Sequence, residues 1–121
     1  MQMSGVARIN AEINSVPYMK ELSEDWRPAT TTAIGKMNGA DCDSFATGKL
    51  VELYKAGMPL ADMRLMECND EKGGLHCVLL VDVDNETYVL DNRYKEPVLM
   101  ERVPYTWVRV QVAGTNKWEW A

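Results

Sequence analysis

The sequence lacks several features that would assign it to a specialised class of protein. No apolar run approaches the ~18 residues that a membrane-spanning helix needs. No cluster of Lys or Arg occurs in a chain of net charge −5, so we expect no membrane segment and no nucleic-acid partner. No apolar signal-peptide core follows the N-terminus, which predicts a cytoplasmic protein. Repeats, low-complexity tracts and linkers are also missing, and we expect one domain over residues 1–121.

Cysteine and histidine are scarce, which limits the kinds of site the chain can build. The three cysteines, Cys42, Cys68 and Cys77, form no C-x-x-C pair, and an odd number without a leader is typical of free thiols. The single histidine, His76, directly precedes Cys77 in an apolar segment with strand character. The two side chains should point to opposite faces of that strand. This disfavours a zinc site, and we expect no cofactor.

The patterns that are present predict an α+β fold, with helices first and an antiparallel sheet after them. The clearest helix starts after Asp41, an N-cap residue, and stops at Gly57. The residues that follow its 3.6-residue helical period, on the side expected to pack on a sheet, are Phe45, Ala46, Lys49, Leu50, Leu53 and Tyr54. Shorter helices are expected at about 5–15 and 28–37. Strands are expected at about 64–68, 75–83, 86–90 and 105–112.

The dipeptide Asp84-Asn85 separates two of these strands and predicts a two-residue hairpin, because both residue types tolerate positive φ. With this turn, Val78 faces Asp91 across the hairpin. His76 and Asp91 then share one face as diagonal neighbours, about 7–8 Å apart at the backbone. A slip of one residue would place them on opposite faces.

Together with Cys42, these two residues supply the ingredients of a Cys–His–Asp nucleophilic site. Cys42 falls in the first turn of its helix, where free N–H groups and the helix dipole favour a thiolate. His76 would exchange protons, and Asp91 would orient the imidazole. Each residue also has a structural interpretation, as a buried thiol, a core histidine or a turn aspartate. Their agreement on one site favours catalysis.

Five segments resemble the bacterial transglutaminase-like cysteine peptidases, a branch of the papain-like superfamily. In chain order they read G-A-D-C-D, L-Y-K-A-G-M-P, M-R-L-M-E-C, L-H-C-V-L-L-V and Y-V-L-D-N, within residues 38–92. The upstream segment D-W-R-P-A-T at 25–30 is similar to the family's D-Y-W-A-T-P. The resemblance implies a papain-like fold, with the nucleophile helix on an antiparallel sheet. It also implies peptide-bond cleavage by Cys42, His76 and Asp91. The size of the chain fits a minimal cytosolic or bacteriophage-encoded member.

The resemblance bears on two further positions. Asn10 corresponds to an Asn near the start of the family domain and is a weak candidate for an oxyanion donor beside the Cys42 backbone N–H. Members often read D-C-E-D, and some bind calcium there. In this chain the run is D-C-D-S, with Asp43 shorter than Glu and one carboxylate fewer. Calcium prefers several anionic oxygens, so a site at Asp41 and Asp43 is at most weak, and we expect no tight one.

The leading hypothesis is a thiol hydrolase that cleaves a peptide or isopeptide bond of a protein or peptide substrate through a cysteine acyl-enzyme. Acyl transfer or deamidation on the same triad is the related alternative. An alternative from another class is a binding or structural protein that keeps the fold without turnover. It would present Trp107, Trp118 and Trp120 as an aromatic contact surface, although the same residues could instead close the core.

Overall fold

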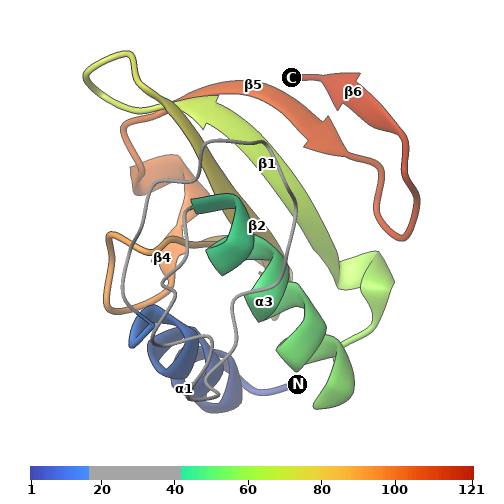
Figure 1. Ribbon diagram of the computed structural model, residues 1–121. Coiled ribbons are helices and arrows are strands. Elements are labelled where there is room, and N and C mark those ends of the chain that lie inside the picture. The colour runs from blue at the N-terminus through green and yellow to red at the C-terminus, as the bar shows by residue number, and fades with distance from the viewer. Residues whose placement is uncertain (17–41) are drawn as a thin grey trace.

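The computed structural model describes residues 1–16 and 42–121 and shows two helices packed on one face of a six-stranded antiparallel sheet (Figure 1). The helices are α1 (Met3–Asn14) and α3 (Cys42–Lys55). The strands are β1 (Met63–Asn69), β2 (Leu75–Val83), β3 (Glu86–Leu90), β4 (Val98–Leu99), β5 (Thr106–Gln111) and β6 (Trp118–Trp120). Short 3-10 helices precede β1 (η1, Leu60–Asp62) and follow β4 (η2, Met100–Arg102). The predicted α+β class is therefore confirmed. The helix expected at 28–37 and the Asp41 cap lie outside the described residues.

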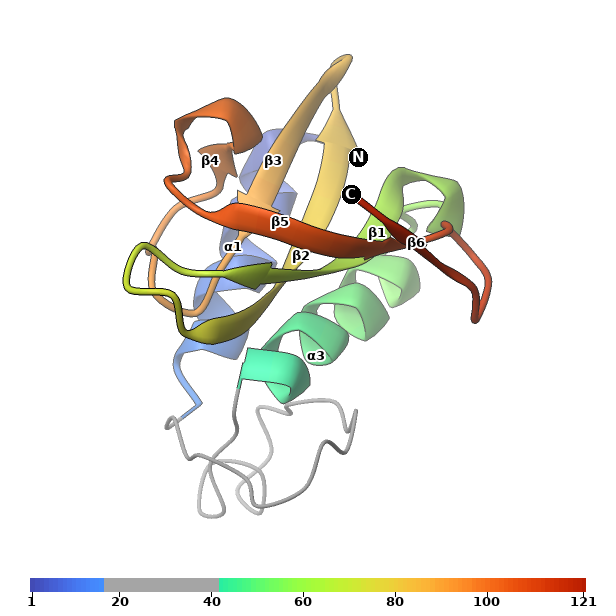
Figure 2. The same ribbon diagram turned by 90° about the horizontal axis from the view of Figure 1, so that it is seen from above.

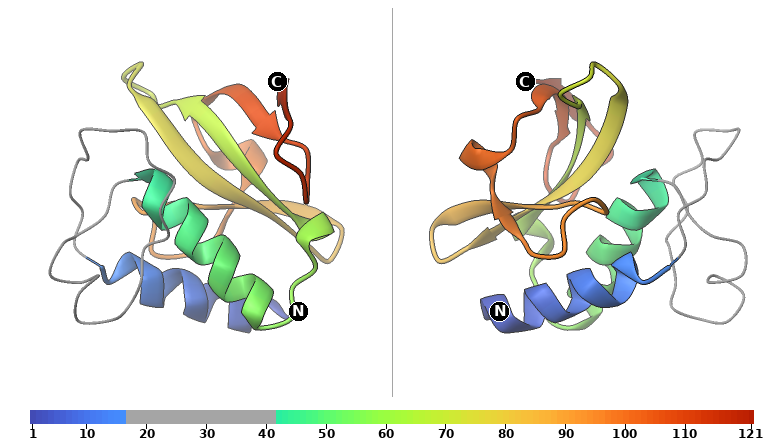
Figure 3. Two further views of the ribbon diagram at one scale, coloured as in Figure 1. Left: turned by 45° about the vertical axis from the view of Figure 1, so that its right-hand side comes forward. Right: turned by 90° about the vertical axis from the view of Figure 1, so that its left-hand side faces the viewer.

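The two helices bury their apolar stripes in one cluster, in which α3 packs on β2 and α1 packs on α3. Val6, Ile9 and Ile13 recur at helical spacing and are buried on α1. On α3, Phe45 and Leu53 are buried in the same cluster. Figures 2 and 3 show both helices on one side of the sheet. The predicted packing of the 42–54 helix on a sheet is confirmed, with two differences within its stripe. Tyr54 is 56% exposed, whereas Lys49 has no exposed surface.

The two faces of the sheet carry separate apolar clusters because side chains alternate along each strand. Cys77, Leu79, Val81 and Val83 of β2 contribute to the cluster that the helices cover. The opposite face has its own cluster, which comprises Met66, Cys68, Val78, Leu80, Val89, Val103 and Tyr105. Cys77 thus lies on the helix side, as its position next to His76 predicted.

The β2–β3 hairpin has the predicted register. Asp84 and Asn85 form the turn with φ of 51° and 66°, and Val83 pairs with Glu86. Two central residues with positive φ are typical of the type I′ turn, whose twist matches that of the flanking strands. The strand order is β4-β3-β2-β1-β5-β6, so β2 lies inside the sheet, between β1 and β3.

Both edges of the sheet contain short strands that the sequence patterns did not predict. β4 adds two residues to β3, and β6 adds three to β5. Of the C-terminal aromatics, Trp107 and Trp118 are partly buried against the two clusters, while Trp120 is 81% exposed. The helices in the described ranges are all too short or too polar to cross a membrane.

Candidate active site

His76 and Asp91 form a buried hydrogen-bonded pair. His76 is the second residue of β2, and Asp91 directly follows the last residue of β3. The hairpin register brings them together, and His76 Nε2 lies 2.8 Å from Asp91 Oδ1. The side chains are only 5% and 0% exposed. An ionised carboxylate only accepts hydrogen bonds, so Nε2 is the donor and Nδ1 is left for other chemistry.

Two further groups bind the Asp91 carboxylate. The Tyr105 hydroxyl donates to Oδ2 at 2.6 Å, and the backbone N–H of Arg93 donates to Oδ1 at 3.0 Å. Burial would raise the pKa of Asp91, but the hydrogen bond and charge of His76, with these two donors, hold it below its usual value. Asp91 is thus kept ionised in a nearly dry environment.

Tyr105 is a site residue that sequence reasoning missed. Its ring meets the His76 ring edge-on, with centroids 5.5 Å apart. Burial and the hydrogen bond to Asp91 raise the pKa of its phenol, so the hydroxyl remains a donor. No local motif marks this residue, because it precedes β5, which is separated from β2 by β1. The contact arises only when the sheet is assembled.

Cys42 is the first residue of α3 and the only one of the three cysteines that is not buried. Its Sγ lies 3.8 Å from Asp43 Oδ1. Burial raises the pKa of Cys68 to about 12, and it raises the pKa of Cys77 well above the ordinary thiol value. Both buried thiols are therefore protonated at neutral pH, and Cys42 is the cysteine whose side chain is partly exposed.

Cys42 lies near the strand that carries His76. Helix α3 packs on β2, and Figures 1 and 2 show its first turn beside the first half of that strand. Charge on Cys42 raises the pKa of both Cys77 and Cys68. Cys77 directly follows His76 in β2, and Cys68 of β1 pairs with His76 of β2. The packing of α3 on β2 thus brings the start of α3 to the half of β2 that carries His76.

Asn10 lies on the α1 side of this region. Its side chain has no exposed surface, and its Nδ2 donates to the carbonyl oxygen of Lys95 at 3.2 Å. Asn14, one turn further along, donates to the carbonyl oxygens of Asp91 and Tyr94, both at 3.1 Å. The structure therefore uses Asn10 to hold the loop after β3. The role of Asn10 as an oxyanion donor stays a prediction, as does that of the Cys42 backbone N–H.

A calcium site near Cys42 would use the acidic residues on either side of it. Asp43 is the second residue of α3, directly after Cys42, whereas Asp41 lies outside the described residues. Within residues 1–16 and 42–121, no three His, Cys, Asp or Glu side chains are grouped so that they could hold a metal ion. The expectation of no tight calcium site stays a prediction.

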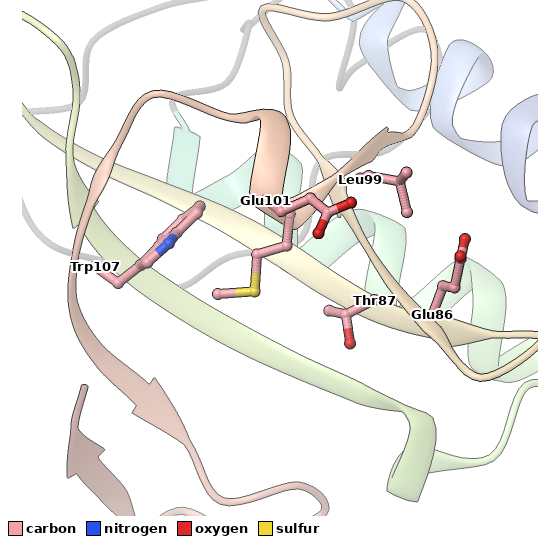
Figure 4. A pocket seen from close by; sticks show the side chains of 6 residues that line it. Glu86, Thr87, Leu99, Glu101 and Trp107 are labelled. Carbon is pink, nitrogen blue, oxygen red and sulfur yellow. The ribbon is translucent and has the colours of Figure 1, made fainter.

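A pocket of about 410 Å³ opens near β3, β4 and η2 (Figure 4). It is lined by Glu86, Thr87, Leu99, Met100, Glu101 and Trp107. Trp107 also contacts Tyr105, with ring centroids 6.0 Å apart, and Tyr105 binds Asp91. The pocket is thus connected to the His76–Asp91 pair through two aromatic rings.

Comparisons with known proteins agree with these features. A sequence model of the bacterial transglutaminase-like cysteine proteinase family matches residues 1–121. Calcium-bound LapG of Legionella pneumophila superposes with a TM-score of 0.79 at 18% identity, over 96% of this chain and 67% of that one. A second LapG structure gives a TM-score of 0.74 at 19% identity, over 88% of this chain and 61% of LapG. At this identity the likeness shows the fold. No curated protein matches the sequence.

Proposed function

The chain belongs to the bacterial transglutaminase-like cysteine proteinases, and we propose that it hydrolyses a peptide or isopeptide bond through an acyl-enzyme on Cys42. Membership makes it a cysteine peptidase-like hydrolase with a protein substrate. The assignment of Cys42, His76 and Asp91 as the triad is our own proposal. The observation that carries it is the buried 2.8 Å hydrogen bond between His76 and Asp91, beside a helix that begins at Cys42.

In the first half-reaction, His76 Nδ1 takes the proton of the Cys42 thiol, and the thiolate attacks the substrate carbonyl carbon. The developing oxyanion is stabilised by the Cys42 backbone N–H at the start of α3. His76 then donates its proton to the leaving amine, the C–N bond breaks, and a thioester remains on Cys42. Throughout, Asp91 accepts from Nε2–H and fixes the ring orientation.

In the second half-reaction, a water molecule attacks the thioester carbonyl while His76 Nδ1 takes its proton. The C–S bond breaks, the carboxylic acid product leaves, and the proton returns to the cysteine sulfur. An amine in place of water would give acyl transfer through the same thioester. Added amine nucleophile therefore separates the two reactions, because only a transferase forms the amide in preference to the acid.

Brief alkylation with substoichiometric iodoacetamide at neutral pH, followed by peptide mass spectrometry, tests the triad without a known substrate. Cys42 is expected to label at least about tenfold faster than Cys68 and Cys77, which serve as controls within the same molecule. His76→Ala should slow the labelling of Cys42 alone. Equal labelling of the three thiols in folded protein, or no effect of His76→Ala, would refute the triad and favour a non-catalytic binding protein.

A further inference from the structure

A salt bridge joins the two loops that flank the His76–Asp91 pair. The first loop is the turn between β1 and β2, residues 70–74, and His76 follows it as the second residue of β2. The second loop begins at Asp91, directly after β3. Asp70 belongs to the first loop and Arg93 to the second, and Arg93 Nη2 lies 2.8 Å from Asp70 Oδ2. The salt bridge therefore ties the turn before the histidine to the loop that carries the acid.

Asp70 divides its two carboxylate oxygens between its own turn and Arg93. Oδ1 accepts hydrogen bonds from the backbone N–H groups of Lys72 and Gly74, at 2.9 Å and 2.8 Å. The backbone N–H of Asp70 also donates to the carbonyl oxygen of Gly74 at 2.8 Å. These bonds close the turn locally, and Oδ2 is the oxygen that binds Arg93. The Asp70 side chain, 9% exposed, is therefore a fixed anchor for the guanidinium.

Arg93 is bonded to the acid as well as to the turn. Its backbone N–H donates to Asp91 Oδ1 at 3.0 Å, the same oxygen that accepts from His76 Nε2 at 2.8 Å. A closed circuit of contacts results, which runs from Asp70 along the turn to His76, across to Asp91, and back through Arg93. Each link of this circuit restrains the position of the carboxylate relative to the imidazole.

The paired part of the hairpin stops short of the two residues. The last pair of the ladder between β2 and β3 is Leu79 with Leu90. His76 and Asp91 both lie beyond it, where strand pairing no longer joins the two segments. The register aligns their side chains, but bonds outside the ladder must hold the loop that begins at Asp91 against the start of β2. Arg93 supplies such a bond, because its side chain reaches the turn that leads into β2.

We propose that Arg93 and Asp70 form a latch of positioning residues that holds the Asp91 carboxylate against the His76 imidazole. The proposal rests on the triad assigned above, in which Asp91 fixes the orientation of the ring. The Arg93 side chain is 43% exposed, and a salt bridge of this kind contributes little to global stability. Its effect is local, because the acid must stay within hydrogen-bond distance of the ring for the histidine to present its other nitrogen to the thiol.

The chain has one histidine, so protein with isotopically labelled histidine gives one Nε2–H signal by NMR. The rate at which this proton exchanges with water, at fixed pH and temperature, reports how often the His76–Asp91 hydrogen bond opens. Arg93→Met removes the guanidinium, whereas Asp70→Asn keeps the Oδ1 acceptor of the turn and replaces the oxygen that binds Arg93. Each variant is expected to speed the exchange about threefold, the factor that corresponds to the loss of a weak salt bridge. Arg93→Lys keeps the charge and should restore part of the protection.

Glu71→Gln is the matched control. Glu71 Oε1 lies 3.6 Å from Arg93 Nη1, so this variant removes the carboxylate next to Asp70 and leaves the latch in place. The exchange rate should stay at the wild-type value. The double variant Arg93→Met/Asp70→Asn should exchange no faster than either single variant, because both changes break the same bond. Urea unfolding should give the wild-type free energy for all of these proteins, which separates positioning from a general loss of stability.

Unchanged exchange in both Arg93→Met and Asp70→Asn would overturn the latch, as would an equal increase in Glu71→Gln. Additive effects in the double variant, or a fall in the unfolding free energy that accounts for the faster exchange, would overturn it as well. The exchange measurement needs neither turnover nor Cys42, so it can fail while the alkylation test of Cys42 succeeds, and the reverse.

Discussion

Replacing Lys49 by methionine is expected to stabilise the protein, and more so at low pH than at high pH. Methionine has a similar length and fills the same buried space without a charge. The pKa of Lys49 falls from 10.5 to about 7 on folding. At 1.36 kcal/mol per unit, keeping this lysine protonated in the folded state costs about 5 kcal/mol.

The direction of the pH dependence follows from which state binds the proton. Below pH 7 the lysine is protonated in both states, and the full destabilisation is present. Between pH 7 and 10.5 the unfolded chain keeps a proton that the folded protein has lost, so stability rises with pH. At pH 9 the remaining destabilisation is about 2 kcal/mol. Lys49→Met should therefore gain about 5 kcal/mol of unfolding free energy at pH 6 and about 2 kcal/mol at pH 9.

Urea unfolding followed by tryptophan fluorescence at pH 6 and pH 9 measures both values. The exposed Lys55→Met provides the reference and should change the unfolding free energy by less than about 0.5 kcal/mol at either pH. The reasoning is refuted if Lys49→Met is less stable than wild type at pH 6. It is also refuted if the gain is the same at the two pH values.

Three further predictions concern the site. Tyr105→Phe removes the 2.6 Å hydrogen bond to Asp91. It should lower the unfolding free energy by about 2 kcal/mol and lower kcat about tenfold. An unchanged kcat would show that Tyr105 does not assist Asp91 in catalysis. Asp91→Asn should retain more turnover than His76→Ala, because its role is orientation and not proton transfer. It should also flatten the acid limb of the stability curve, since stability from ionised Asp91 is present above pH 3.8 and lost as pH falls through its lowered pKa. Micromolar calcium or EDTA should leave Tm unchanged, whereas a rise of several degrees with calcium would reveal a site at Asp41 and Asp43.

The local elements of this protein are encoded over short stretches of chain. The spacing of Val6, Ile9 and Ile13 is enough to predict α1, because a buried helical face repeats every 3.6 residues. The Asp84-Asn85 dipeptide predicts both the hairpin and its register, because a two-residue turn permits only one pairing of the strands. That register brings His76 and Asp91 together before any tertiary contact is considered.

The tertiary structure decides what lies around that pair. Tyr105 reaches Asp91 only because β5 adds to the sheet beyond β1, and strand order depends on contacts between segments far apart in sequence. The short edge strands β4 and β6 form for the same reason, since two or three residues carry no periodic signal. Lys49 fits the helical period of α3, but its complete burial depends on how α1, α3 and the sheet pack. The sequence by itself therefore determines the helices, the hairpin and the His76–Asp91 pairing, because turn chemistry and side-chain period act locally. The electrostatic environment of the acid is decided by tertiary packing, because burial and charge proximity are properties of the assembled core.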